Sequence, residues 1–240
     1  MATTICNNPG GAPFGLFTQS ATQDINVGSR FVDQAGNTYV YAKAGASDLV
    51  AGTLVQAPAE VTNHQNCAPT GTAAIGATSV TITLGATAAT ANQYAGGWMV
   101  TTETPGEGYK YLIASHPAAD SAATLTLTLS DPLQVALTTS SHVDLVPNPY
   151  SGVIINPTTA SSCPVGVATD VVAAGQYGWL QIGGVATVLA DGNLTVGTSL
   201  VASNGTAGAV EALTGVQAII GVAVTGIATT EFGAVRLFLA

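Results

Sequence analysis

The chain has 240 residues, of which 47% are hydrophobic and only 7% are charged. Soluble domains usually carry about a quarter charged residues, so we expect much of this surface to be covered by other protein. Four basic residues, scattered singly among thirteen acidic ones, give a net charge of -9, which excludes the clustered cations that bind nucleic acid or an anionic membrane surface.

Short apolar segments with the alternation of β-strands recur along the chain, and few segments have the spacing of an amphipathic helix. The clearest are residues 79–84 and 124–129, where Val, Ile or Leu alternates with Ser or Thr. Gly- and Pro-containing turns at residues 34–37 and 105–108 predict hairpins. In chain order, the predicted strands are residues 30–33, 38–41, 79–84, 98–102, 109–113, 124–129, 142–146, 152–156, 177–182, 185–189, 219–225 and 233–239. The sequence therefore predicts an all-β chain, with antiparallel strands in a β-sandwich or barrel.

A short internal repeat bears on the domain organisation. Residues 49–55 (LVAGTLV) resemble residues 194–201 (LTVGTSLV), and the shared pattern is Leu-x-x-Gly-Thr. This pattern is typical of a tight glycine turn that leads into a strand of a small barrel, although so short a repeat also arises by chance.

We expect three parts. Residues 20–70 together with residues 158–240 form one discontinuous β-barrel-like domain, and residues 71–157 form an inserted central β domain. Residues 1–19, rich in Gly, Pro and Asn, form an extended N-terminal arm.

The three cysteines, Cys6, Cys67 and Cys163, are odd in number and widely spaced, so we expect free thiols, with an intermolecular disulfide between assembled copies as the alternative. The N-terminal residues have neither the basic region nor the continuous apolar region of a secretory signal. No apolar stretch reaches the ~20 residues of a membrane-spanning helix. The sequence thus predicts folding in the cytosol and no transmembrane segment.

Signatures of common catalytic, cofactor-binding and metal sites are missing from the sequence. The strongest candidate cluster is Ser140-Ser141-His142-Val143-Asp144, in which strand alternation places His142 and Asp144 on one face. Such a pair is able to orient an imidazole or bind a cation. The interpretation that we favour is an exposed His and Asp near a strand end, so we predict no catalytic, cofactor-binding or metal site and no enzyme activity.

The other candidate residues have structural interpretations. His64, in a polar segment, and His116, before a proline, are expected to be solvated or at an interface. Glu103 and Glu107 flank a Pro-Gly turn, and this turn is favoured over a glycosidase carboxylate pair. Both tryptophans, at positions 98 and 179, are expected in the core or as interface anchors.

Several segments resemble virion proteins of tailed phages, including capsid decoration (cement) proteins. The segments are residues 176–186, 191–192, 196–201, 219–223, 27–32, 39–41 and 92–97, which consist of glycine turns and hydrophobic strands. This resemblance implies a β-rich protein made in the host cytoplasm that binds the outside of an icosahedral shell. It also implies a homotrimer that bridges subunits of the major capsid protein, with neither nucleic acid nor membrane as a partner and with no cofactor.

Two alternatives stay open. The first is a structural protein of a phage tail or fibre. The second is a secreted adhesin or carbohydrate-binding module, which would require an export signal and a cluster of exposed aromatic residues.

Overall fold

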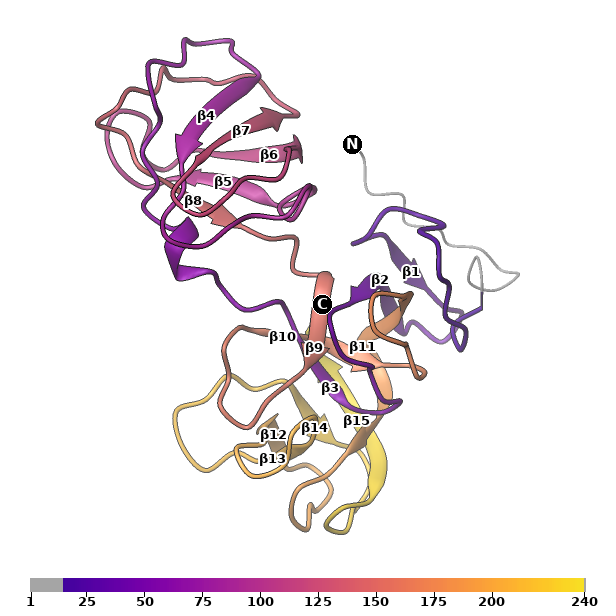
Figure 1. Ribbon diagram of the computed structural model, residues 1–240. Helices are drawn as coiled ribbons and strands as arrows, with labels where there is room; N and C mark the ends of the chain where they lie inside the picture. Colours follow the sequence, from indigo (N-terminus) through magenta and orange to yellow (C-terminus); the bar gives the residue numbers. More distant parts are fainter. Residues whose placement is uncertain (1–14, 240) are drawn as a thin grey trace. The chain divides into compact units, whose positions relative to one another are not determined.

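A computed structural model describes residues 15–239, so Cys6 and most of the expected N-terminal arm lie outside the described residues. The protein is nearly all β, with 40% of its residues in strands, which confirms the predicted fold class (Figure 1). Within residues 15–239, the structure has one helical turn, η1, at Thr62–His64. The strands are β1 (Arg30–Val32), β2 (Thr38–Ala44), β3 (Leu54–Gln56), β4 (Ser79–Thr83), β5 (Trp98–Thr101), β6 (Lys110–Ser115), β7 (Thr124–Leu129), β8 (Val143–Val146), β9 (Ser151–Ile155), β10 (Pro164–Ala168), β11 (Tyr177–Leu189), β12 (Ser199–Ala202), β13 (Val210–Ala212), β14 (Gly221–Ala223) and β15 (Phe232–Phe238).

The chain divides into two compact units. The outer unit comprises Met1–Ala59 and Pro149–Ala240, and the inserted unit comprises Glu60–Asn148. These boundaries precede the expected ones, at residues 70/71 and 157/158, by about ten residues. The reason is strand pairing: Cys67 and Pro69 form β-bridges to Val143 and Ile82 inside the inserted unit, whereas β9 pairs with β2 and β3 of the outer unit.

The inserted unit is a closed five-stranded barrel with the order β4-β7-β6-β5-β8. Alternation in β4 and β7 buries every second side chain, including Ile82 and Leu127, which are fully inaccessible to solvent. The hydroxyl side chains lie on the other face, and Thr81 and Thr126 hydrogen-bond across the two strands at 2.9 Å between their Oγ1 atoms. The alternation predicted for these two segments is therefore confirmed.

The outer unit is a curled ten-stranded sheet with the order β1-β2-β9-β3-β10-β11-β15-β14-β12-β13. At its centre, β11 is one strand of thirteen residues, where two strands were predicted. Its first half pairs with β2 and its second half with β15. The pairing register with β2 shifts between Gln181 and Gly183, and such a bulge bends a strand without ending it.

Eight loops share one hydrogen-bonding pattern and associate in pairs, which we call turn pairs. In each loop an apolar residue forms an isolated antiparallel bridge to the equivalent residue of its partner loop, and both residues donate backbone N–H groups to each other's carbonyl oxygens. A turn follows each bridging residue. If the bridging residue is i, the backbone N–H of residue i+4 donates to the carbonyl oxygen of residue i+1. The bridging residues are Leu49 with Val172, Leu194 with Ile227, Ala73 with Leu137, and Ala89 with Ala119.

The turn pairs account for the internal repeat in the sequence. Gly52 and Gly197 take positive φ angles of 75° and 84°, which glycine adopts at little cost. Strands β3 and β12 begin two residues after these glycines. The predicted glycine turn that leads into a strand is thus present at both copies of the repeat, and each unit contains two turn pairs.

Candidate functional site

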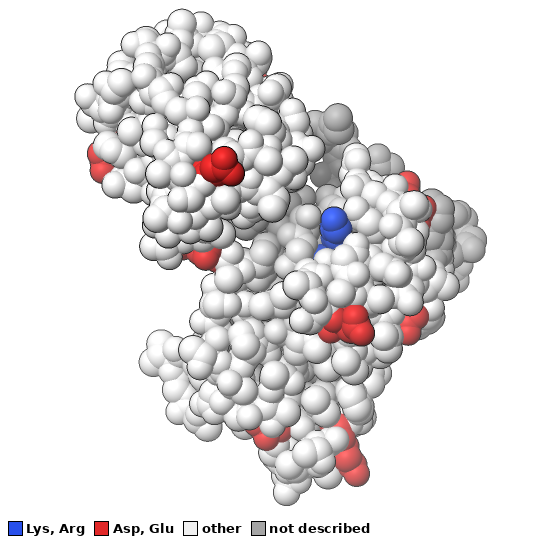
Figure 2. Space-filling model, in the orientation of Figure 1, with Lys and Arg blue, Asp and Glu red and all other residues white. Residues whose placement is uncertain are grey.

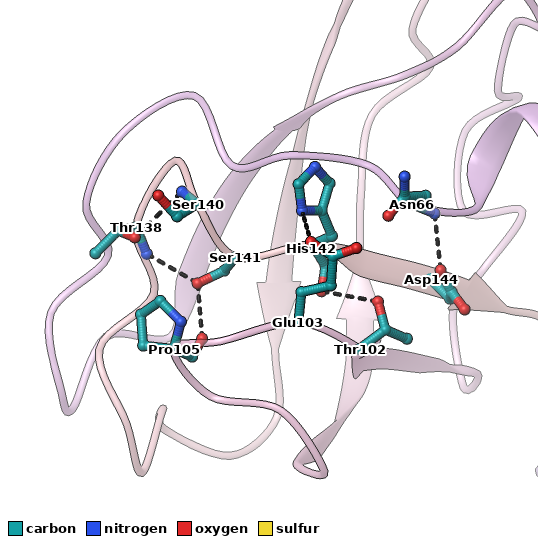
Figure 3. Close-up of polar contacts among 9 residues, drawn as sticks. All are labelled: Asn66, Thr102, Glu103, Pro105, Thr138, Ser140, Ser141, His142 and Asp144. Carbon is teal, nitrogen blue, oxygen red and sulfur yellow. Dashed lines mark hydrogen bonds and ion pairs between the residues drawn. The ribbon is translucent and has the colours of Figure 1, made fainter.

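The cluster that the sequence singles out lies where the chain enters β8 (Figure 3). Val143 and Leu145 are buried in the barrel core, so His142 and Asp144 share the opposite face, as alternation predicts. Their contacts are separate. His142 Nδ1 lies 2.7 Å from Glu103 Oε2, and this contact is an ion pair when the imidazole is protonated, although its geometry is not that of a hydrogen bond. Asp144 Oδ1 instead accepts a hydrogen bond from the backbone N–H of Asn66 at 2.7 Å.

Ser141 is fully buried and has a structural role in the same segment. Its Oγ donates a hydrogen bond to the carbonyl oxygen of Pro105 at 2.7 Å and accepts one from the backbone N–H of Thr138 at 3.1 Å. The bond from Thr138 closes the turn at residues 137–141, and the bond to Pro105 joins that turn to the turn at Pro105 (Figure 3). A hydroxyl held in this way supports two turns and is not presented to His142 as a nucleophile would be.

The two histidines that were expected to be solvated or at an interface are buried, so that expectation is wrong. His64 has no exposed surface and His116 is 4% exposed. His64 Nε2 contacts the carbonyl oxygen of Thr87 at 2.9 Å, and His64 Nδ1 contacts the hydroxyl of Tyr94 at 2.5 Å. Since a carbonyl oxygen only accepts, Nε2 carries the proton and Nδ1 accepts from Tyr94.

His116 has the opposite tautomer. Its Nδ1 lies 2.8 Å from the carbonyl oxygen of Pro117, and its Nε2 accepts the backbone N–H of Tyr94 at 3.0 Å. Burial lowers the pKa of His116, and this effect is opposed by the hydrogen bond to Pro117 and reinforced by the charge of His64. Burial also raises the pKa of Tyr94. The His116 imidazole is therefore a neutral core group, and both imidazole rings pack against Tyr94, with ring centroids 5.6 and 5.8 Å from that of the tyrosine.

A groove of about 470 Å³ in the outer unit is a concave surface that sequence reasoning missed. Its lining residues come from β2, β10, β11, β15 and three segments between or before strands, and none of them is Asp, Glu, Lys, Arg or His. They are Phe17, Tyr39, Ala51, Gly52, Val167, Ala168, Thr169, Gln181, Val185, Thr187 and Phe232. No sequence pattern marks this surface, because its residues are brought together only by the pairing of distant strands.

Three polar side chains of the groove, those of Thr169, Gln181 and Tyr39, already have partners within the fold. Thr169 Oγ1 donates to the carbonyl oxygen of Leu16 at 2.6 Å, and Gln181 Nε2 donates to the carbonyl oxygens of Gly183 and Val185. Tyr39 donates its hydroxyl to Asp33, and burial together with the Asp33 charge raises the pKa of Tyr39 to about 12. The groove is thus suited to apolar contact and not to proton transfer.

The remaining candidates have the following environments. Trp179 is buried against Phe31 and Tyr41, whereas Trp98 is partly exposed, with Lys110 Nζ 5.7 Å from its ring centroid. Among residues 15–239, no three His, Cys, Asp or Glu side chains form a group suited to a metal ion. In the same range, no helix has the length and apolarity that a membrane crossing requires.

Of the cysteines that the structure describes, both are free: Cys67 is buried and Cys163 is exposed. Burial raises the pKa of the Cys67 thiol.

Comparison with known proteins identifies no similar protein. No model of a known protein family matches the chain, and neither do the curated proteins or the solved structures with which it was compared.

Proposed function

We propose that the chain is a structural protein of a tailed-phage virion, of the capsid decoration (cement) type. It binds the outer surface of an icosahedral shell and stabilises the shell by bridging subunits of the major capsid protein. The observation that carries the proposal is the scarcity of charge: four basic and thirteen acidic residues among 240. The face in Figure 2 is almost entirely uncharged, with acidic residues at separate positions.

An uncharged surface suits broad protein contact, because a buried charge must be desolvated and paired. The hydroxyl face of β4 and β7 and exposed apolar side chains such as Val196, which is 68% exposed, are surfaces of this kind. A standard interface buries about 1,600 Å² in total, and apolar area contributes about 25 cal/mol per Å² before the costs of association. The segments that resemble cement proteins support the same assignment.

The turn pairs favour this function because they hold loops in one conformation without a disulfide or a metal. Leu194 and Ile227, for example, exchange two backbone hydrogen bonds at 2.8 and 3.0 Å between the loop that joins β11 to β12 and the loop that joins β14 to β15. A rigid surface loses little conformational entropy when it binds. Rigid surfaces of this kind, present on every copy that binds a shell, are consistent with a non-enzymatic protein that acts as a homotrimer. We propose neither nucleic acid nor membrane as its partner.

The test is binding of the purified chain to capsids that lack it. We expect saturable co-sedimentation with the shells and a higher temperature of DNA release from filled particles. Because the contacts are proposed to be uncharged, the affinity should change less than about threefold between 0.05 and 0.5 M NaCl, unlike contacts formed by ion pairs.

A chain that leaves the shells bare at saturating concentration would refute the proposal. Localisation of the chain to the tail by immunogold labelling would replace it with the tail or fibre alternative. Isolated tails therefore serve as the control particle in the same experiment.

A further inference from the structure

The loop that joins β13 to β14, residues 213–220, presents apolar side chains to solvent. Val216 is fully exposed and Ile219 is 45% exposed. Between Glu211 and Glu231 the chain has no charged residue. An exposed apolar loop without charge indicates a contact surface.

Both ends of this loop are fixed on the same strand. The backbone N–H of Leu213 donates to the carbonyl oxygen of Ser199, and that of Ile220 donates to the carbonyl oxygen of Leu200, both at 2.9 Å. The loop therefore crosses the beginning of β12 between two anchor points. Binding through an anchored loop requires less ordering than binding through a free segment.

The groove in the outer unit is a complementary surface. It is concave, about 470 Å³ in volume, and three exposed apolar side chains form part of its lining: Phe17, Val185 and Phe232, which are 72%, 51% and 50% exposed. A volume of this size accommodates a drug-sized ligand and so has room for apolar side chains at the tip of a loop. Its lining shares no residue with the loop.

Electrostatics favours a second copy of the chain as the occupant. Each copy carries a net charge of -9, so the mutual repulsion of two copies opposes their contact least where both contact surfaces lack carboxylates. Both the loop and the groove lining are free of Asp and Glu. A strongly basic partner would instead be drawn to carboxylates elsewhere on the chain.

We infer that the loop at residues 213–220 of one copy docks in the groove of a second copy. Because the two surfaces differ, the contact is heterologous: each copy offers one loop and one groove, so repetition gives a closed ring or an open chain of subunits. This contact requires no capsid. Its failure would leave shell binding untouched, and a failure of shell binding would leave this contact untouched.

The test compares three variants of the full chain by sedimentation velocity over a range of concentrations. Val216→Asp alters the loop, Val185→Asp alters the groove, and Ile75→Asp places the same charge at an exposed apolar turn of the inserted unit as a matched control. We expect wild type and Ile75→Asp to associate alike. The loop and groove variants should associate at least about tenfold more weakly, because each buries an unpaired carboxylate.

Mixing the two weakened variants gives the decisive result. The Val216→Asp chain keeps a normal groove and the Val185→Asp chain keeps a normal loop, so one contact forms between them and the mixture gives heterodimers that grow no further. If the contact used the same surface on both copies, mixing the two variants would not restore association.

Wild type that stays monomeric at every concentration would overturn the inference, as would a mixture without heterodimers. The inference would also be overturned if residues 1–14 of the same chain occupied the groove. In that case the chain would be monomeric, and Val185→Asp would alter the groove whereas Val216→Asp would not. Circular dichroism checks the fold of each variant. If Val185→Asp does not fold, Phe17→Ser replaces it as the groove variant, because the Phe17 side chain is 72% exposed.

Discussion

Leu49 and Val172 donate backbone hydrogen bonds to each other's carbonyl oxygens, at 2.8 and 3.2 Å, although the whole inserted unit lies between them in the sequence. The pairing brings together the two segments of the outer unit. It also sets the entry into β3 and β11, which follow the two turns. The inserted unit thus lies, in the sequence, between two segments that pair with each other in one sheet.

Leu49→Ala is expected to reduce the free energy of unfolding by about 2–5 kcal/mol, the usual range for a Leu at a site like this one, which is 1% exposed. Val50→Ala, at the neighbouring position that is 46% exposed, serves as the control and should change it by about 0.5 kcal/mol or less. Urea denaturation measures both. Equal losses in the two variants would show that the bridging residue does not anchor the outer unit.

Tyr94→Phe removes the hydroxyl that satisfies His64 Nδ1 inside the inserted barrel. A buried acceptor without its donor costs about 1–3 kcal/mol, and we expect a loss of stability in this range. Tyr109→Phe, at a position that is 44% exposed, is the control and should leave stability unchanged. The hydroxyl–imidazole bond would be unimportant if both variants denatured at the wild-type urea concentration.

Acid should destabilise the inserted unit through His116. Burial lowers the pKa of this group in the folded state, whereas an unfolded His titrates near pH ~6.5. Below that pH the unfolded chain therefore binds more protons at this histidine than the folded chain does. The stability that neutral His116 contributes is fully present above pH ~6.5, and it is lost as the pH falls from there to the folded-state pKa. Protonation at Nε2 would also direct an N–H at the backbone N–H of Tyr94.

Hydrogen exchange followed by mass spectrometry tests this acid effect, because it reports on peptides of each unit separately. Between pH 7.5 and 5.5, protection corrected for intrinsic exchange should fall in residues 60–148. His142→Gln, which alters a partly exposed imidazole, should leave the decline in place. A decline that disappears in this control would assign the effect to His142 instead.

Ser141→Ala should cost more stability than Glu103→Gln. The Ser141 hydroxyl is buried and bonded to two turns, and its loss leaves the carbonyl oxygen of Pro105 without this donor, at a cost of about 1–3 kcal/mol. The Glu103 side chain is 54% exposed, and surface ion pairs contribute about 0–1 kcal/mol. Thermal melts of the two variants give the comparison, and the reverse order would contradict the structural role assigned to Ser141.

Residue alternation was sufficient to predict several strands and the fold class. Residues 124–129 form β7 as predicted, and β4 ends one residue earlier than predicted, because both segments have one buried and one exposed face. Four strands are missing from the ranges predicted by alternation: β3, β10, β12 and β13, although the glycine turns at Gly52 and Gly197 predicted a strand where β3 and β12 begin. These four strands have three to five residues, and all three residues of β3 are buried, so no alternation identifies β3.

The candidate site shows the same limit. Sequence reasoning placed His142 and Asp144 on one face of a strand, and their positions on β8 and just before it agree with that geometry. It gave no sign that His64 and His116 are buried beside Tyr94, because their partners, Thr87 and Pro117 among them, satisfy them through backbone carbonyls that any residue provides. Nor did it indicate the groove, whose lining combines residues from Phe17 to Phe232.

Taken alone, the sequence determined the β character, the scarcity of charge and the glycine turns, because each of these depends on residue type and on neighbours a few positions away. Only the tertiary structure decided that β11 runs unbroken between two partners, that the units divide at residues 59/60 and 148/149, and which loops form turn pairs. Those features depend on hydrogen bonds between residues far apart in the chain. Such bonds form only when the whole sheet closes, and the local pattern of side chains does not specify their partners.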